Sequence, residues 1–168
     1  FTSITEQIPA NTVVNLLNGI FDKIVKEIIA QGGHVDKFMG DAVMAVFRGN
    51  YHLDRAIDAA LAIKEVLGNI EEIDAGNKKY KPEISIGINS GEMVSGNIGS
   101  ETLKRLDYTV IGDSVNLAQR LQTVAQAGQI IISEAVYQKA KESFSCEKIG
   151  EVKLKNKSQP VVIYQVLE

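Results

Sequence analysis

Two long stripes of apolar residues at helical spacing constrain this fold more than any other feature of the chain. In the first stripe, apolar residues recur at helical spacing over residues 13–29, with Asn11 as the expected cap and Gly32-Gly33 as the stop. The second stripe covers residues 56–70 and ends before the polar loop 74–82. Because stripes of this width face a hydrophobic core in globular proteins, the sequence predicts two long helices, each buried on one face.

Short runs rich in β-branched residues predict the strands. Isoleucines alternate with smaller residues over 84–88, as in a half-buried strand. Residues 93–98 follow across the short Ser90-Gly91 turn, so we expect these two strands to form a hairpin. Further elements are expected at 130–132 as a buried strand, at 133–141 as a short helix capped by Ser133, and at 161–164 as the strand that closes the sheet. This order of helices and strands predicts an α+β fold.

The composition indicates a single intracellular domain. The chain has 168 residues, 45% of them hydrophobic and 23% charged, which is enough for one sizeable core over residues 1–168. The lone Cys146 cannot form an internal disulfide, which favours the cytoplasm, and we expect its thiol to be buried rather than reactive. No membrane-spanning run or signal peptide is visible, and the 18 basic and 21 acidic residues are interspersed. Neither membrane contact nor nucleic acid binding is therefore expected.

The stretch Asp107-Tyr-Thr-Val-Ile-Gly-Asp-Ser-Val-Asn-Leu-Ala-Gln-Arg120 predicts a strand, a turn and a helix. The helix is expected to begin near Asp113 or Ser114, with Asp113 acting as a cap. Asn116 and Arg120 are four residues apart and therefore share one helix face. An amide beside a guanidinium suits a ribose edge and a phosphate. The same spacing also occurs on ordinary solvated helix faces, so spacing by itself leaves both interpretations open.

A second stretch, residues 32–47, predicts a strand, a Gly40-Asp41 turn and another strand. Asp41 would then lie at a rigid, exposed hairpin tip, where a carboxylate can bind a metal ion. Mg²⁺ is usually held by one or two carboxylates plus substrate phosphates, so Asp41 would supply half a site. In isolation, the pattern favours an ordinary turn aspartate and, for Lys37, a solvent-facing strand residue.

Taken together, the two stretches resemble the catalytic domain of the class III nucleotidyl cyclases, the family of adenylyl and guanylyl cyclases. The resemblance covers nearly the whole chain and rests on several motifs in a fixed order. These motifs are Phe1-Thr2, residues 37–47, Ser85-Ile-Gly-Ile-Asn-Ser-Gly91, Gly96-Asn-Ile-Gly99 and residues 108–120. The resemblance implies a ferredoxin-like α+β fold with a mainly antiparallel central sheet flanked by helices. It points to the branch that contains the cyanobacterial and soluble adenylyl cyclases.

The resemblance also implies residue roles. By position, Asp41 matches a metal-binding aspartate, and Lys37 with Thr109 matches the pair of residues that selects the base. In adenylyl cyclases this pair is Lys with Asp or Thr. In guanylyl cyclases it is usually Glu with Cys or a small residue. An ammonium can donate to an adenine ring nitrogen and a hydroxyl can accept from the exocyclic amine, whereas guanine reverses these demands, so ATP is the implied substrate. Asn116 resembles the residue that orients the ribose and stabilises the transition state, and Arg120 the one that neutralises the phosphates.

Two further matches involve the ends of the chain. Phe1 and Thr2 match a substrate-binding segment, and Lys155 or Lys157 matches a phosphate-binding lysine, in a loop that departs from the commoner Lys-Gly-Lys form. In the family a first metal aspartate lies four residues before the Phe-Thr, within a pattern of the type Phe-x-Asp-Ile-x-x-Phe-Thr. That aspartate and its strand are missing here. We therefore expect residues 1–168 to be a cyclase catalytic domain without its first strand, cut from a longer polypeptide.

The implied reaction is cyclisation of ATP to 3',5'-cyclic AMP with release of pyrophosphate. It would use two ions of Mg²⁺ or Mn²⁺ per site, with Ca²⁺ also compatible with oxygen ligands. In the family, the metal aspartates come from one subunit and the base-selecting and transition-state residues from its partner. Because this chain carries both sets, a homodimer with two composite sites is expected. An upstream regulatory domain in the parent protein is also implied.

Two other functions stay open. The missing aspartate favours a catalytically inactive cyclase-like module that dimerises and signals. A guanylyl cyclase is the other alternative, and Lys37 and Thr109 argue against it. A diguanylate cyclase needs a Gly-Gly-Asp/Glu-Glu-Phe turn, which Gly40-Asp41-Ala42 does not supply.

Overall fold

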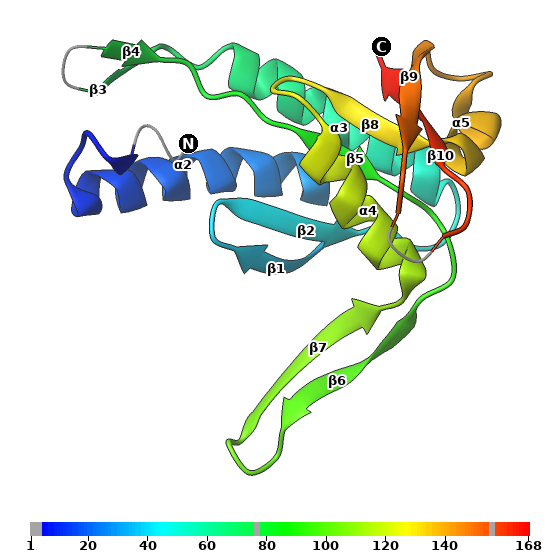
Figure 1. Cartoon of the computed structure of the whole chain (residues 1–168). Helices are drawn as coiled ribbons and strands as arrows, with labels where there is room; N and C mark the ends of the chain where they lie inside the picture. The colour runs from blue at the N-terminus through cyan, green and yellow to red at the C-terminus, as the bar shows by residue number, and fades with distance from the viewer. Residues whose placement is uncertain (1–4, 76–77, 155–156) are drawn as a thin grey trace. The chain divides into compact units, whose positions relative to one another are not determined.

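The computed structural model describes residues 5–75, 78–154 and 157–168. These residues divide into two compact units, Phe1–Ile84 and Ser85–Glu168, each of which combines helices with strands (Figure 1). The predicted α+β class is therefore confirmed. No helix in the described ranges is both long enough and apolar enough to cross a membrane.

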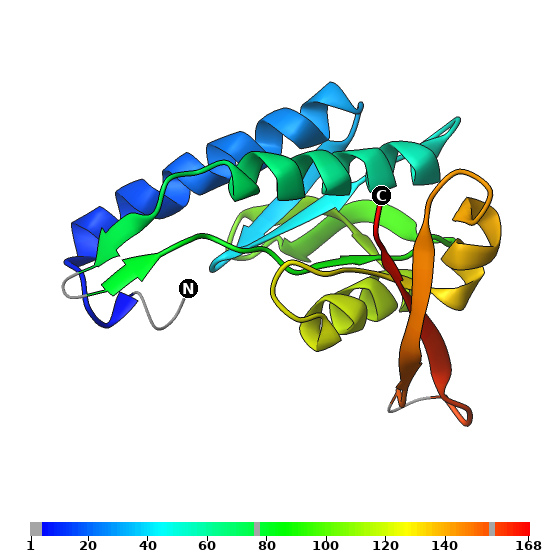
Figure 2. The ribbon, with the colours of Figure 1, turned by 90° about the horizontal axis from the view of Figure 1, so that it is seen from above.

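The first unit is built on two long helices, α2 (Ala10–Ala30) and α3 (His52–Gly68), which lie side by side (Figure 2). Both apolar stripes thus form the helices they predict. The buried residues are Ile24 and Ile28 on α2 and Leu53, Ile57, Ala59, Ala60, Ile63 and Leu67 on α3. The expected cap was wrong, because α2 begins at Ala10 behind Pro9 and the Asn11 side chain lies inside the first turn. The predicted stop is confirmed: Gly32, at φ +72°, donates its N–H to Ile29 as the helix ends.

Two hairpins complete the first unit. Strands β1 (His34–Met39) and β2 (Ala42–Val46) pair antiparallel across a tight turn, as predicted. Gly40 occupies that turn at φ +61°, a conformation that a residue with a Cβ adopts only at a cost. The short strands β3 (Ile73–Ala75) and β4 (Lys78–Tyr80) form the second hairpin.

Arg55 ties two loops of the first unit together. Its guanidinium donates hydrogen bonds to the carbonyls of Gln31 and Gly32, at 3.1 and 3.2 Å, where α2 ends. It also donates to the carbonyls of Asn50 and Arg48, in the loop between β2 and α3. The planar fork of an arginine satisfies several acceptors at once, and carbonyls at a helix end have no partner within the helix. Arg55 therefore fixes the point at which the chain leaves α2 for the β1–β2 hairpin.

Replacing Arg55 with Met is expected to destabilise the protein by about 2 kcal/mol, because several charge-assisted hydrogen bonds are lost together. Arg55→Lys should recover less than half of that loss, since one ammonium cannot reach carbonyls on both loops. Urea unfolding followed by circular dichroism measures both values. Arg105→Met is the control, because the Arg105 side chain is 82% exposed and its change should stay within about 0.5 kcal/mol. Equal losses of stability for Arg55→Met and Arg105→Met would show that the hydrogen bonds of Arg55 to the two loops do not stabilise the protein.

The second unit contains a four-stranded sheet in the order β5-β8-β10-β9. Its strands are β5 (Ile86–Ile88), β8 (Ile130–Ser133), β9 (Cys146–Val152) and β10 (Val161–Val166). Helices α4 (Asp113–Val124) and α5 (Glu134–Ala140) pack against this sheet. Strand β8 is buried throughout, as predicted, and the Ser133 hydroxyl accepts a hydrogen bond from the Val136 N–H, which confirms it as the α5 cap.

Two strand pairings differ from the expectation. Strand β5 runs parallel to β8 and forms no hairpin with the strand that follows it. Strand β10 does not close the sheet, because it lies between β8 and β9. Strand β9 carries charges at Glu147, Lys148 and Glu151 and is mostly exposed, so its sequence lacks the apolar alternation that would have revealed it.

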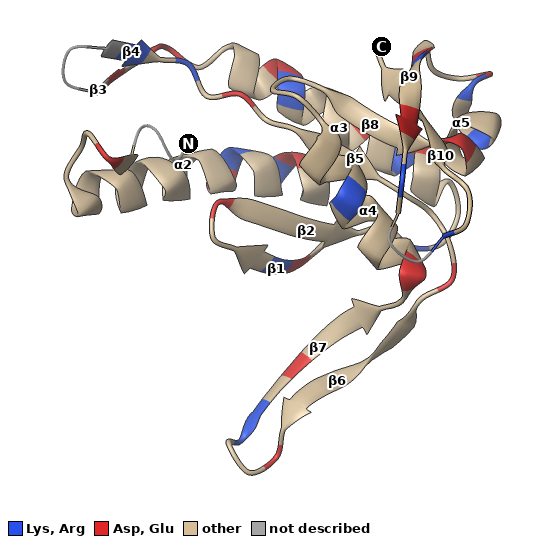
Figure 3. Ribbon diagram, in the orientation of Figure 1, with Lys and Arg blue, Asp and Glu red and all other residues tan. Residues whose placement is uncertain are grey.

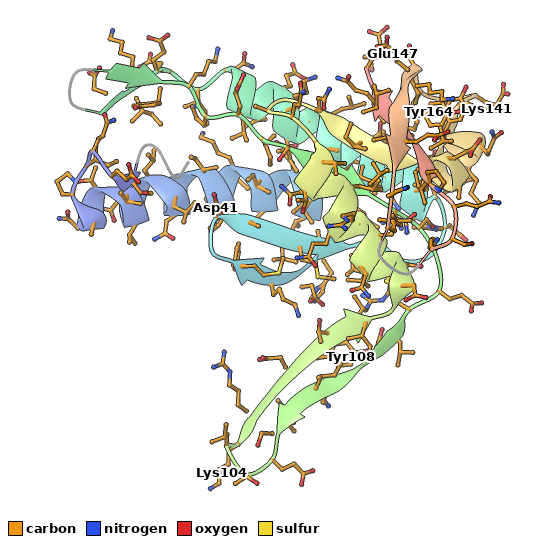
Figure 4. All side chains as sticks on the ribbon, viewed as in Figure 1. Asp41, Lys104, Tyr108, Lys141, Glu147 and Tyr164 are labelled. Carbon is orange, nitrogen blue, oxygen red and sulfur yellow. The ribbon has the colours of Figure 1, made fainter. Side chains whose placement is uncertain are left out.

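The remaining strands, β6 (Val94–Ser100) and β7 (Arg105–Ile111), form a long two-stranded hairpin (Figure 1). The two strands meet at a turn between Ser100 and Arg105, with Lys104 at its end (Figure 4). Much of the apolar surface of this hairpin is exposed, including 66% of Val94, 77% of Leu103 and 61% of Tyr108. Exposed apolar residues gathered on one element mark a surface suited to a protein partner.

Candidate functional site

The first group of candidate residues lies on the β1–β2 hairpin. Asp41 follows Gly40 at the exposed turn between the strands (Figure 4). Lys37 lies on β1 opposite Met44, and its side chain is 40% exposed. The Lys37 Nζ is 3.5 Å from a carboxylate oxygen of Asp36. The hairpin thus presents the exposed carboxylate of Asp41 and the Lys37 ammonium, which pairs with Asp36.

The second group lies on β7 and α4. Thr109 lies opposite Gly96 in the β6–β7 ladder and is only 6% exposed. Asn116 and Arg120 share a face of α4, where Asn116 is exposed and Arg120 half-buried. The opposite face of α4 buries Leu121 completely. Helix α4 therefore has a core face and a polar face, and the polar face carries both candidate residues.

Glycine and asparagine residues that sequence reasoning did not single out hold α4 in place. A Cβ on Gly87 of β5 would collide with the α4 backbone at Ala118 and Gln122, so the helix packs directly on the strand at this glycine. The Asn89 amide donates to the Ser114 carbonyl at 3.1 Å in the first turn of α4. Its oxygen accepts from the Ser133 hydroxyl at 2.9 Å. Gly87 and Asn89 both belong to the 85–91 motif, and this motif was the one sequence feature that could have pointed to them.

The N-terminus of α4 differs from the predicted capping. Gly112, at φ +147°, occupies the cap position, and Asp113 is the first helical residue and makes no side-chain cap. The expectation that Asp113 caps the helix was therefore wrong. The backbone where the strand meets the helix has a positive φ, which favours glycine, so Gly112 takes the cap position and Asp113 falls one residue after it. The Asp113 carboxylate in the first turn still interacts favourably with the helix dipole.

A cavity of about 250 Å³ opens beside the start of α4 in the second unit. Its lining residues include the polar Asn89, Asp113, Ser114 and Glu134 together with Lys157. Lys157 is thus the described member of the two candidate phosphate-binding lysines. Lys155 lies outside the described residues, as do Phe1 and Thr2.

Asp41 offers the only acidic side chain with a predicted metal role in the described ranges. No group of three or more His, Cys, Asp or Glu residues is arranged around a metal position within those ranges. The exposed Asp41 carboxylate is a hard oxygen ligand, which suits Mg²⁺ or Mn²⁺ when substrate phosphates complete the coordination. The described residues therefore fit a metal site to which the protein contributes the Asp41 carboxylate and the substrate phosphates contribute further ligands. They do not form a site in which the protein supplies every ligand.

Charges and the lone thiol add little to the site by themselves. Basic and acidic residues are interspersed along the ribbon (Figure 3). Burial raises the pKa of the Cys146 thiol above its ordinary value of 9.0, and its sulfur lies 3.7 Å from the Phe144 carbonyl oxygen. The thiol is therefore protonated at neutral pH and a poor nucleophile. Cys146 is only partly buried, however, so the expectation of a buried thiol was wrong.

Comparisons with known proteins place this geometry in a family. The sequence model for the "Adenylate and Guanylate cyclase catalytic domain" family matches residues 1–168. The adenylate cyclase of Anabaena cylindrica is 36% identical over 99% of this chain. The crystal structure of the adenylyl cyclase CyaB from P. aeruginosa superposes with a TM-score of 0.85 at 34% identity and covers 99% of this chain and 88% of CyaB. The guanylyl cyclase Cya2 superposes at 0.79 with 34% identity and covers 99% of this chain and 85% of Cya2.

Similar scores for an adenylyl and a guanylyl cyclase mean that overall likeness does not choose between ATP and GTP. The chain spans between 8% and 34% of the length of the first curated relatives it matches. The match over the full chain and the high structural similarity are nonetheless decisive at the level of the family. The chain belongs to the family of adenylate and guanylate cyclase catalytic domains.

Proposed function

We propose that this domain is an adenylyl cyclase that converts ATP to 3',5'-cyclic AMP and pyrophosphate. The observation that carries the proposal is the presence of Lys37 on β1 together with Thr109 on β7. An ammonium at the first position donates to an adenine ring nitrogen, and a hydroxyl at the second accepts from the exocyclic amine. Guanine presents an N1–H donor and an O6 acceptor instead, and it would leave polar groups unpaired.

In the proposed reaction, the ribose 3'-oxygen forms a bond to the α-phosphorus while the bond from that phosphorus to the bridging oxygen of pyrophosphate breaks. The hydroxyl proton passes to solvent and pyrophosphate leaves with the electron pair. The Arg120 guanidinium neutralises charge that develops on the phosphates, and the Asn116 amide orients the ribose. The exposure of Asn116 and the rigid helix beneath both residues support these roles.

Divalent metal ions are general in this family, and Asp41 would contribute a carboxylate to binding them here. When bound, such ions lower the pKa of the attacking hydroxyl and offset the charge of the triphosphate. Asp41 suits this task because its turn is exposed and its backbone is held by two paired strands. We propose Mg²⁺ or Mn²⁺ as the working ions, two per site, with Ca²⁺ also compatible with the ligand type.

We further propose that the active form is a homodimer with two composite sites. One chain carries both Asp41 and the set formed by Lys37, Thr109, Asn116 and Arg120, so two copies of it can supply everything that two sites need. The exposed apolar residues of the β6–β7 hairpin, with Tyr108 among them (Figure 4), support an interface on that element. We propose a cytoplasmic location and an upstream regulatory domain for the parent protein.

The decisive experiment incubates the full-length natural polypeptide with ATP or GTP in the presence of Mg²⁺ or Mn²⁺ and separates the products by chromatography. Cyclic AMP should form, with kcat/KM for ATP at least about a hundredfold above that for GTP. Formation of cyclic GMP from GTP in excess over cyclic AMP would identify a guanylyl cyclase. A folded dimer that makes neither product would support the catalytically silent signalling module.

A further inference from the structure

Strand β1 contains a β-bulge at Asp36. In the antiparallel ladder, Val35 lies opposite Ala45 and Lys37 lies opposite Met44, so Asp36 is an extra residue that shifts the register of the ladder. In a regular strand, neighbouring side chains point to opposite faces. A bulge changes that alternation and redirects a side chain, and bulges are frequent next to active sites.

The bulge brings two neighbouring charges together. The Asp36 side chain is only 3% exposed, and its carboxylate oxygen lies 3.5 Å from the Lys37 Nζ. The Lys37 side chain keeps 40% of its surface exposed, so its ammonium is anchored on one side and open on the other. A lysine side chain has a flexible four-carbon stem and loses conformational freedom when its end is held. A buried carboxylate is itself held by packing, so it provides a fixed anchor for that end.

We propose that Asp36 is a positioning residue for substrate selection, which acts by holding the Lys37 ammonium in the place where it reads the base. This inference rests on the proposed function, in which Lys37 donates to adenine. A free lysine could extend towards a ring nitrogen or towards guanine O6, because an ammonium has three rotatable donors. An ammonium held at a fixed point discriminates between the two bases by geometry as well as by charge. The bulge is the backbone feature that makes this arrangement possible.

The test compares Asp36→Asn with a matched control, Asp22→Asn, in the full-length natural polypeptide. Asparagine keeps the size of the side chain and one oxygen acceptor but removes the charge. Asp22 also pairs with a lysine, Lys26, at 2.9 Å, yet both side chains are well exposed on α2, at 65% and 72%. For each variant, kcat and KM are measured with ATP and with GTP, and thermal unfolding verifies that the protein is folded.

Asp36→Asn should lower the ratio of kcat/KM for ATP over GTP by about tenfold, mainly through a higher KM for ATP. Asp22→Asn should leave that ratio unchanged. In a Lys37→Met background, Asp36→Asn should have no further effect on the ratio, because Asp36 acts through Lys37. A purely structural role for Asp36 would instead lower stability and reduce both activities in parallel, with the ratio kept.

The outcomes separate this inference from the proposed function. A wild type that makes cyclic AMP, together with an Asp36→Asn variant of unchanged ratio, overturns the positioning role alone. A wild type that makes no cyclic nucleotide overturns both. If Asp36→Asn fails to fold, Asp36→Glu takes its place, since it keeps the charge and moves it by one methylene. A lowered ratio for this variant supports the role, and an unchanged ratio overturns it.

Discussion

An equal mixture of the Asp41→Ala and Arg120→Ala variants is expected to recover about a quarter of the wild-type cyclase activity, although each variant alone should keep only about 1% of it or less. Under the proposed function, loss of Arg120 removes an electrostatic contact to the transition state, and loss of Asp41 removes a metal ligand. Each change should lower kcat by about a hundredfold or more. Asp41 is exposed and Arg120 half-buried on the polar face of α4, so the free energy of unfolding should change by less than about 1 kcal/mol in either variant.

The recovery follows from the arrangement of composite sites. In a mixed dimer, one site receives both substitutions, and the other combines an intact Asp41 with the partner subunit's intact Arg120. About half of the dimers in a random mixture are mixed, and each has one working site of two. The variant that carries both substitutions is the control, because its mixture with either single variant contains no intact site. An inactive mixture of the two single variants, with subunit exchange verified, would mean that both residues serve a site within one subunit.

Gly87→Ala should destabilise the protein by about 3 kcal/mol and lower its Tm by roughly 6–12 °C. The added Cβ would meet the backbone of α4 at Ala118 and Gln122, and backbone atoms cannot rotate away as a flexible side chain can. Helix α4 would have to move off β5, and it carries Asn116 and Arg120. We therefore expect kcat to fall by more than the unfolded fraction explains, because misplacement of catalytic groups by about 1 Å can cost on the order of a hundredfold.

Differential scanning calorimetry measures the first effect, and kinetics well below the Tm measure the second. Gly96→Ala is the matched control for stability, since Gly96 also lies on a strand and a Cβ there would meet nothing within 4 Å. Its Tm should stay within about 2 °C of the wild type. Similar losses for both variants would show that the close approach of α4 to β5 is not what makes Gly87 necessary.

Much of the candidate site followed from sequence. The strand–turn–strand at Asp41 and the strand–turn–helix that carries Thr109, Asn116 and Arg120 both formed as predicted. The roles of these residues are predictions, which the substitutions at Asp41 and Arg120 test. The burial of Thr109 and the pairing of Lys37 with Asp36 were not predictable from the pattern. The burial of Thr109 depends on the tertiary packing around the β6–β7 ladder, and the pairing of Lys37 depends on the bulge in β1. The spacing of residues along the chain encodes neither.

The sequence by itself determined both long helices, several of the strands and the types of residue in the candidate site. The spacing of apolar residues in helices and strands reflects contacts between residues that are close in sequence. The apolar stripes of α2 and α3 could therefore be recognised from the sequence. The tertiary structure decided which strands pair: β5 chose the distant β8 over its neighbour, and β10 lies between β8 and β9. The tertiary structure also brings the α4 backbone against Gly87 and, through a bulge in β1, the Asp36 carboxylate to within 3.5 Å of the Lys37 Nζ. These choices depend on packing between segments far apart in sequence, where loop closure and burial of the whole unit outweigh local preference.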